Sequence, residues 1–171
     1  MPALWGLGTL YRCHTKSDSS GVLEFAKYFR DNHIPCDIIG IEPGWQSHAY
    51  SCTFSWDKEK FSDWQDMIAK LKADNYHINL WEHAFTNPQS PIYEDLKPYS
   101  GNYEVWEGLV PDFAYNEAAK IFAEYHRNKL VKEGISGFKL EECDGSDFTG
   151  GWSFPDLSEF PSGIDGEQMH N

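Results

Sequence analysis

Basic side chains are scarce in this sequence of 171 residues. Fourteen Lys and Arg stand against 27 Asp and Glu, so the formal net charge is −13. Such a charge repels nucleic acids and anionic membrane surfaces. No apolar run reaches the roughly 20 residues of a membrane span, and the first residues do not resemble a signal peptide. We expect a soluble chain with no nucleic-acid or membrane partner, and we leave its compartment open.

Motifs for metal and redox chemistry are also missing. The four cysteines, at 13, 36, 52 and 143, include no C-x-x-C pair, and the seven histidines are dispersed. Zinc sites and dithiol redox sites need close spacing of their ligands or thiols. No glycine-rich phosphate loop follows a strand-like segment. The sequence therefore predicts neither a metal nor a cofactor.

Apolar and aromatic residues, in contrast, are plentiful. Hydrophobic residues make up 40% of the chain and aromatic residues 16%, which is typical of a globular protein and not of a disordered one. The length suffices for one domain with a core of its own. The aromatic excess suits a heavy core and, equally, a cleft that binds sugars.

Segments with strand patterns alternate with segments of helical periodicity. The apolar runs 36–41 and 77–81 predict buried strands, and 4–11 and 137–140 complete a set of four. Helices are expected around 22–29, after the serines at 19 and 20, and over 57–73 and 116–131, with Asn75 and Gly134 after the last two and Asn116 as an N-cap. Such alternation indicates right-handed βαβ units and a parallel sheet, either doubly wound or in a barrel.

Two segments do not follow this alternation. Residues 84–112 predict a long excursion at one end of the sheet, and 144–171 read as an irregular tail. Functional side chains of parallel α/β proteins gather where the strands end. Carboxylates and aromatic rings stand there after three of the predicted strands: Glu42 and Trp45, then Trp81, Glu82 and His83, then Glu141, Glu142 and Asp144. Any one of these acids could also be a solvated charge.

The segment GFKLEECDGSDF (137–148), followed by WSFPDLSEFPSGIDGEQMHN (152–171), resembles the fourth-strand region of glycoside hydrolase family 31. Other segments agree with that family in the same order: PALWGLG, IPCDIIGIEPGW, TFSWD, HINLWEH and GLVPDFAYNEAAKIF. The resemblance implies a (β/α)8 TIM-barrel fragment of about four parallel βα units. Residues 1–171 would then be a partial catalytic barrel, strands one to four plus the loop that follows.

Members of that family are retaining enzymes that act on α-linked sugars, and the resemblance implies a carbohydrate partner. It places the nucleophile two residues after Lys139, at Glu141, where the family has an aspartate. It also implies substrate contacts for Glu42, Trp45, Trp81, Lys139 and Asp144. The segment 153–168 favours an α-galactoside or a similar substrate. A general acid/base is expected beyond the fourth strand, outside this chain.

These expectations describe an enzyme fragment that is inactive alone. The extra methylene of Glu141 moves the attacking oxygen by about an ångström, and a retaining mechanism tolerates little misplacement. The alternative is a non-catalytic carbohydrate-binding module, or a half-barrel that self-associates through its open edges. A third reading is a small doubly wound protein unrelated to glycosidases.

Overall fold

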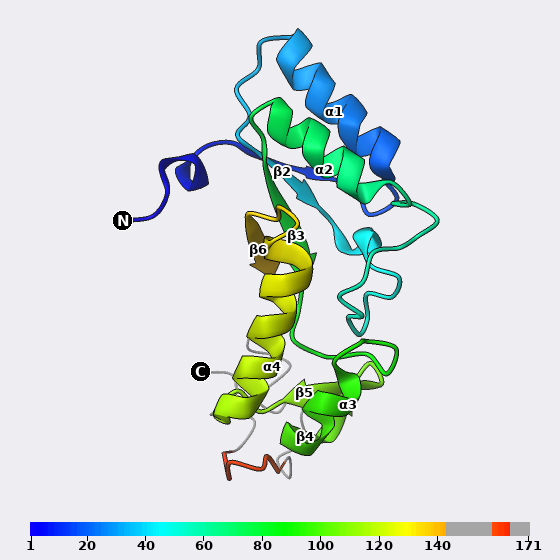
Figure 1. Ribbon diagram of the computed structural model, residues 1–171, viewed down its shortest axis with the longest axis vertical. Coiled ribbons are helices and arrows are strands. Elements are labelled where there is room, and N and C mark those ends of the chain that lie inside the picture. The colour runs from blue at the N-terminus through cyan, green and yellow to red at the C-terminus, as the bar shows by residue number, and fades with distance from the viewer. Residues whose placement is uncertain (143–158, 165–171) are drawn as a thin grey trace. The chain divides into compact units, whose positions relative to one another are not determined.

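The structure, a computed structural model, describes residues 1–142 and 159–164. The chain forms two compact units (Figure 1). The first comprises Met1–Ser47, Ser55–Trp81 and Lys129–Lys139, and the second comprises His48–Phe54, Glu82–Asn128 and Leu140–Asn171. None of the described helices is long and apolar enough to cross a membrane.

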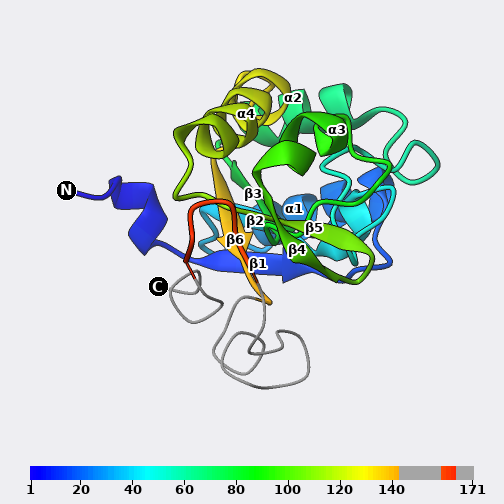
Figure 2. The same cartoon turned by 90° about the horizontal axis from the view of Figure 1, so that it is seen from below.

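A four-stranded sheet is the main element of the chain. Its strands are β1 (Leu10–Cys13), β2 (Ile38–Ile41), β3 (His77–Glu82) and β6 (Gly137–Leu140), in the order β1-β2-β3-β6. β1 pairs with β2 in parallel, and β2 with β3. The amide of Ser136 donates to the carbonyl of Ile78, which begins the contact of β6 with β3. The expected parallel sheet of four strands is confirmed, and β1 and β6 are its two edges. Figure 2 shows these strands from below.

One face of this sheet forms the core of the first unit. Alternate strand residues, among them Ile39, Ile41, Ile78 and Leu80, are buried against two helices that lie side by side, α1 (Ser19–Asp31) and α2 (Trp64–Ala73) (Figure 1). Successive strand side chains point to opposite faces, so residues between these positions face away from the helices. The sheet therefore has an apolar helix-covered face and a second, more polar face.

Local hydrogen bonds shift three of the expected element boundaries. The apolar run 4–11 is not one strand, because Leu4–Leu7 form a 3-10 helix and pairing begins near Thr9, whose carbonyl accepts from Ile38. α1 is capped by Asp18, whose carboxylate accepts from the Gly21 amide, and not by the serines. α2 begins at Trp64 and not at residue 57, because the Asp57 carboxylate accepts from the amides that follow it and holds a turn.

The ends of the helices follow the sequence more closely. After α2, Asn75 adopts a left-handed backbone, and the Tyr76 amide donates to the Leu71 carbonyl, which closes the last turn. α4 (Asn116–His126) continues as a π-helical turn over Arg127–Val131, and Gly134 follows with a φ of +120°. Asn116 is not the N-cap of α4, because Tyr115 occupies that position.

The second unit contains the excursion expected over 84–112. It is not irregular throughout: α3 (Tyr93–Leu96) and a 3-10 turn (Lys97–Tyr99) lead into an antiparallel hairpin of β4 (Ser100–Val105) and β5 (Gly108–Pro111). A small cluster of Phe85, Val105, Val110 and Phe160 packs beneath the hairpin. The sequence did not predict this hairpin, because most residues of β4 are polar and form no apolar run.

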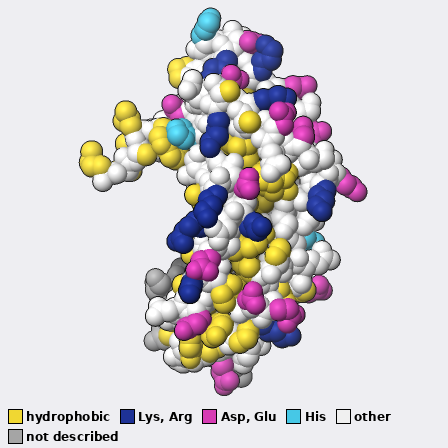
Figure 3. All heavy atoms as spheres, viewed as in Figure 1, with side chains coloured by type: hydrophobic (Ala, Val, Ile, Leu, Met, Phe, Trp, Pro, Cys, Tyr) yellow, Lys and Arg dark blue, Asp and Glu magenta, His cyan; other side chains and the backbone are white. Residues whose placement is uncertain are grey.

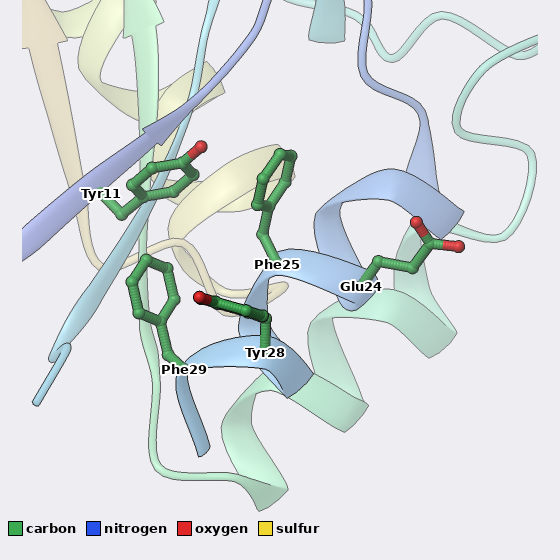
Figure 4. A pocket seen from close by; sticks show the side chains of 5 residues that line it. All are labelled: Tyr11, Glu24, Phe25, Tyr28 and Phe29. Carbon is green, nitrogen blue, oxygen red and sulfur yellow. The ribbon is translucent and has the colours of Figure 1, made fainter. Parts of the chain in front are cut away.

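An aromatic groove of about 500 Å³ lies between β1 and α1 in the first unit (Figure 4). Tyr11, Phe25, Tyr28 and Phe29 line it together with Glu24. The rings of Tyr11 and Phe25, like those of Tyr11 and Phe29, have centroids 5.0 Å apart. In the view of Figure 3 the acidic and basic side chains are interspersed, with no extended patch of one sign.

Candidate functional site

An arginine holds Glu42 at the carboxyl end of β2. The Arg12 Nε donates to the Glu42 carboxylate, and Arg12 Nη1 donates to Asn79 Oδ1 over 2.9 Å. Arg12, Gly40 and Asn79 are register partners on adjacent strands and lie on the polar face of the sheet. Both members of the Arg12–Glu42 pair are largely buried, with 21% and 23% of their side chains exposed. Glu42 is thus a fixed anion and not a mobile loop acid.

Glycines make room for this arrangement. A β-carbon on Gly40 would lie 2.9 Å from Arg12 Nη1, so any side chain there would displace the guanidinium. A β-carbon on Gly44 would lie 1.8 Å from the Thr15 carbonyl oxygen, which is backbone and cannot move aside easily. The turn after β2 therefore needs glycine for close approach of two loops, and this turn sets the position of Glu42.

Trp45 and Trp81 are joined inside the first unit. Trp45 is fully buried in the core, and its Nε1 donates to the Trp81 carbonyl over 2.7 Å. Trp81 is 1% exposed and follows Leu80, the register partner of Ile41, so it stands level with Glu42 along the sheet. Trp45 offers no exposed surface to a sugar and supports Trp81 from the core side.

Lys139 belongs to β6 and is half-buried. Its neighbour Phe138 packs on the helix-covered core, so alternation places Lys139 on the polar face, as it does Gly137. A β-carbon on Gly137 would contact the Asn79 amide at 3.4 Å, which agrees with that orientation. The strand therefore turns Lys139 toward the face that carries Arg12 and Glu42.

In the second unit, Glu141 lies directly after the last residue of β6. Its amide donates to the Glu82 carbonyl over 3.0 Å, which ties it to the end of β3, and its side chain is half-buried. The next residue, Glu142, has a φ of +63°, a left-handed backbone that a residue with a β-carbon adopts at a cost of about 1 kcal/mol. The chain thus changes direction immediately after Glu141.

Glu82 forms a buried pair with a histidine of α4. Its Oε2 lies 3.2 Å from His126 Nε2, and the two side chains are 2% and 8% exposed. His126 Nδ1 donates to the Phe122 carbonyl over 2.8 Å, and its ring stacks on Phe122 with centroids 4.0 Å apart. Glu82 is therefore a structural anchor for the end of β3 and not a solvated acid.

Three aromatic rings pack together in the second unit, and one of them, that of Tyr50, contacts the acid that follows Glu141. The Tyr50 hydroxyl donates to Glu142 Oε1 over 3.2 Å, and the Tyr50 ring meets Trp106 edge to face with centroids 5.1 Å apart. Burial, and after it the charge of Glu142, raises the pKa of Tyr50 to about 12. The His83 ring lies 5.8 Å from that of Tyr50 and 5.3 Å from that of Trp106, and burial lowers its pKa to about 3, so it is neutral at physiological pH.

The sequence therefore found several of the groups at the strand ends and missed others. Glu42, Trp81 and Lys139 stand at the carboxyl end or on the polar face of the first unit, and Glu141 at the end of β6 in the second. Asp144 lies outside the described residues, and that Glu141 shares a pocket with Trp81 and Glu42 stays a prediction. Arg12 and Tyr50 were missed because an isolated Arg in a strand and an isolated Tyr in a loop carry no pattern.

Cys13, Cys36 and Cys52 are buried, and burial raises the pKa of Cys13 to about 12, so its thiol is protonated at physiological pH. Cys143 lies outside the described residues. Among residues 1–142 and 159–164, no cluster of three or more His, Cys, Asp or Glu could hold a metal ion.

Comparison with known proteins assigns the fold to a family. The family described as "Glycosyl hydrolases family 31 TIM-barrel domain" matches residues 1–171, the whole chain. The chain belongs to glycoside hydrolase family 31. Its four parallel strands are accordingly part of a (β/α) barrel, and the doubly wound alternative is excluded.

Relatives within family 31 are distant and much longer. The α-xylosidase XylQ of Lactiplantibacillus pentosus is 26% identical over 156 residues, which cover 82% of this chain and 20% of the xylosidase. Alpha-glucosidase 2 of Bacillus thermoamyloliquefaciens is 26% identical over 151 residues, 79% of this chain and 19% of the glucosidase. The chain thus spans about a fifth of the relatives it matches.

Solved structures of the family share the fold. A Flavobacterium johnsoniae dextranase complexed with glucose has a TM-score of 0.78 at 21% identity, over 99% of this chain and 22% of the dextranase. A xylosidase from Aspergillus niger has a TM-score of 0.77 at 17% identity, over 95% of this chain and 26% of the xylosidase. At these identities the likeness concerns the backbone.

Proposed function

We propose that this chain is the N-terminal half of the catalytic barrel of a retaining α-glycosidase, with Glu141 at the nucleophile position. One observation supports this most strongly: Glu141 follows the last residue of β6, and its amide is hydrogen-bonded to the end of β3. In barrels of this type, residues that stand where strands end carry the chemistry. Family membership makes glycoside hydrolysis the reaction to test.

In the proposed reaction, the Glu141 carboxylate attacks the anomeric carbon of an α-linked sugar. A C–O ester bond forms to Glu141 while the bond to the leaving oxygen breaks, and a general acid protonates that oxygen. Water then hydrolyses the ester with the help of a base. We assign no residue of this chain to the acid/base role, so we propose that the chain alone does not turn over.

The remaining roles follow the positions of the side chains. We propose that Glu42, fixed by Arg12, accepts hydrogen bonds from sugar hydroxyls, and that Trp81, which is only 1% exposed, supports the wall of the pocket from within. Lys139 would contact substrate from the polar face of β6, and Asp144 from the loop after it. Because Trp45 is buried, we propose that it acts through Trp81 and does not touch the sugar.

The substrate class is inferred from one sequence segment and from the relatives. The segment 153–168 favours an α-galactoside, whereas the relatives named above are an α-xylosidase, an α-glucosidase and a dextranase. Several structures of the family were solved with sugars, among them glucose, isomaltotriose and xylose. We therefore propose a carbohydrate ligand with an α-linkage and test the galacto, gluco and xylo series in parallel.

Mechanism-based labelling tests the role of Glu141. The chain is incubated with 5-fluoro-α-galactosyl, -glucosyl and -xylosyl fluorides, whose fluoride leaves without a proton, so this reaction needs no general acid. We expect one sugar per chain in the intact mass, none in Glu141→Gln, and one in the control Glu24→Gln on the exposed face of α1. Absence of label with all three sugars, or equal label in Glu141→Gln, would refute the assignment.

A turnover assay tests the proposed inactivity. Nitrophenyl α-glycosides of the same three sugars should release no more than one nitrophenolate per chain, because no base is assigned to hydrolyse the ester. Steady release that disappears in Glu141→Gln but persists in Glu24→Gln would show that the chain supplies its own acid/base.

A further inference from the structure

We propose that Tyr50 is a positioning residue for the acidic pair Glu141–Glu142 and that its hydroxyl contacts a sugar bound beside Glu141. This inference rests on the proposed function. It assigns a role to a loop residue that neither the family resemblance nor the sequence pattern had singled out. All the contacts that carry it lie within the second unit.

The first observation is the direct contact with the acids. The Tyr50 hydroxyl donates to Glu142 Oε1 over 3.2 Å, although 92 residues separate the two in sequence. Glu142 is the neighbour of Glu141, and the charges of both carboxylates contribute to raising the pKa of the phenol. A phenol in that position stays protonated at physiological pH and serves as a hydrogen-bond donor.

The second observation is that the ring is held by neighbouring rings while a large part of the residue stays accessible. Trp106, in the turn of the β4-β5 hairpin, meets the Tyr50 ring edge to face at 5.1 Å, and His83 lies 5.8 Å from it. Yet Tyr50 is 43% exposed. An aromatic ring that is braced on one side and open on the other, beside carboxylates, suits the mixed apolar and hydroxylated surface of a sugar.

The third observation is a network of buried polar groups that fixes the loop of Tyr50. The Ser51 hydroxyl donates to the Trp106 carbonyl over 3.2 Å, and the Asn87 amide donates to the Ser51 hydroxyl over 3.2 Å. Asn87 Nδ2 also lies 3.0 Å from His48 Nδ1. The residue after Tyr50 is therefore tied to the same hairpin turn that supports its ring.

Together these contacts make Tyr50 a donor with two possible acceptors. In the sugar-free protein the hydroxyl bonds to Glu142. With a sugar bound beside Glu141, a sugar hydroxyl competes for the same donor, and the exposed part of the braced ring is available to the sugar. The chemical class that fits is a neutral pyranoside with hydroxyls near the reacting carbon.

Fluorine NMR of the chain labelled with 3-fluorotyrosine tests the contact with the acids without any assumption about function. Tyr50→Phe identifies the Tyr50 resonance by removing it. We expect Glu142→Gln to shift this resonance, and the control Glu24→Gln to leave it in place. A resonance that does not respond to Glu142→Gln overturns the proposal, whether or not Glu141 is labelled by glycosyl fluorides.

The contact with sugar is tested by ligand and by labelling kinetics. Methyl α-galactoside, methyl α-glucoside or methyl α-xyloside should shift the Tyr50 resonance in wild type. Tyr50→Phe should raise the concentration of 5-fluoro-α-glycosyl fluoride that gives half-maximal labelling of Glu141. We expect an increase of about tenfold, the usual scale for one hydrogen bond to a ligand. Tyr28→Phe, which removes the same oxygen from an exposed ring of α1, should leave it unchanged.

The outcomes separate the two proposals. Labelling of Glu141 with no effect of Tyr50→Phe on the half-maximal concentration refutes the sugar contact and leaves the nucleophile assignment intact. A Tyr50 resonance that shifts with a methyl glycoside while Glu141 stays unlabelled supports Tyr50 as a sugar contact and refutes the nucleophile. A sugar that shifts neither the resonance nor the mass refutes both.

Discussion

Replacing His126 by Phe tests whether the buried Glu82–His126 pair anchors the end of β3. The variant keeps a ring that can stack on Phe122 and meet Phe54 edge to face, whose centroid is 5.0 Å from that of His126, but it removes the nitrogen 3.2 Å from Glu82. Glu82, only 2% exposed, then has no histidine partner. Removing one partner of a buried pair typically costs about 3 to 5 kcal/mol. We expect about 3 kcal/mol here, because Phe preserves the packing.

Amide hydrogen exchange followed by mass spectrometry measures this loss of stability locally, in the segment that contains His126. With about 3 kcal/mol lost, amides of 116–128 should exchange roughly 150-fold faster at neutral pH. Peptides of α1, which belongs to the first unit, serve as the internal control. The double variant Glu82→Met/His126→Phe removes the orphaned carboxyl and should recover at least half of the loss.

Two results would refute this reasoning. Exchange in 116–128 that accelerates less than threefold in His126→Phe would mean that the pair contributes little. A double variant that exchanges faster than the single variant would mean that His126 matters through packing alone. Because the Glu82 carbonyl accepts from the Glu141 amide, the account also requires the Glu141 amide to exchange faster in His126→Phe.

Three further predictions concern pH, the turn after β2 and the edges of the sheet. Because burial lowers the pKa of His83 to about 3, the unfolded chain binds a proton at this histidine between pH values of about 6.5 and 3, whereas the folded chain does not. The free energy of unfolding should therefore fall with falling pH in this range, by up to about 1.4 kcal/mol per pH unit. Urea titrations of His83→Asn should show a flatter dependence on pH. Gly44→Ala should lower the free energy of unfolding by about 2 kcal/mol, and with it the urea midpoint, because the added β-carbon meets the Thr15 carbonyl. The control Gly6→Ala, which adds a β-carbon in open space, should not lower the midpoint. Equal midpoints of the two variants would contradict this geometry. If the chain self-associates through the two edges of the sheet, its sedimentation coefficient should rise with concentration. Leu140→Lys should abolish this rise, because Leu140 is 71% exposed on the edge strand β6. A sedimentation coefficient of the wild-type chain that does not depend on concentration would contradict the prediction.

The sheet could be predicted from the sequence because its strands are short runs buried among apolar neighbours. Residues 36–41 and 77–81 have this pattern, and they agree with β2 (Ile38–Ile41) and β3 (His77–Glu82) to within two residues at each end. The stretch 4–11 has the same composition but divides into a 3-10 helix and the start of β1. There Trp5 stacks on His77 with centroids 3.8 Å apart, a tertiary contact that no local pattern reports.

The candidate site was predictable only where it follows strand ends. Glu42 and Glu141 were found because they come directly after such runs. Arg12 and Tyr50 depend on partners 30 and 92 residues away, Glu42 and Glu142, and a single sequence does not reveal such pairs. Glu82 was grouped with the site acids, yet its pairing with His126 makes it structural, because only burial distinguishes the two roles.

The central claim is that Glu141 occupies the nucleophile position of a family 31 barrel. The most direct test is to digest the chain after reaction with a 5-fluoro-α-glycosyl fluoride and to locate the ester bond by tandem mass spectrometry. We expect the sugar on Glu141 and on no other carboxylate. A sugar on Glu142, on Glu42 or on Glu82 would contradict it.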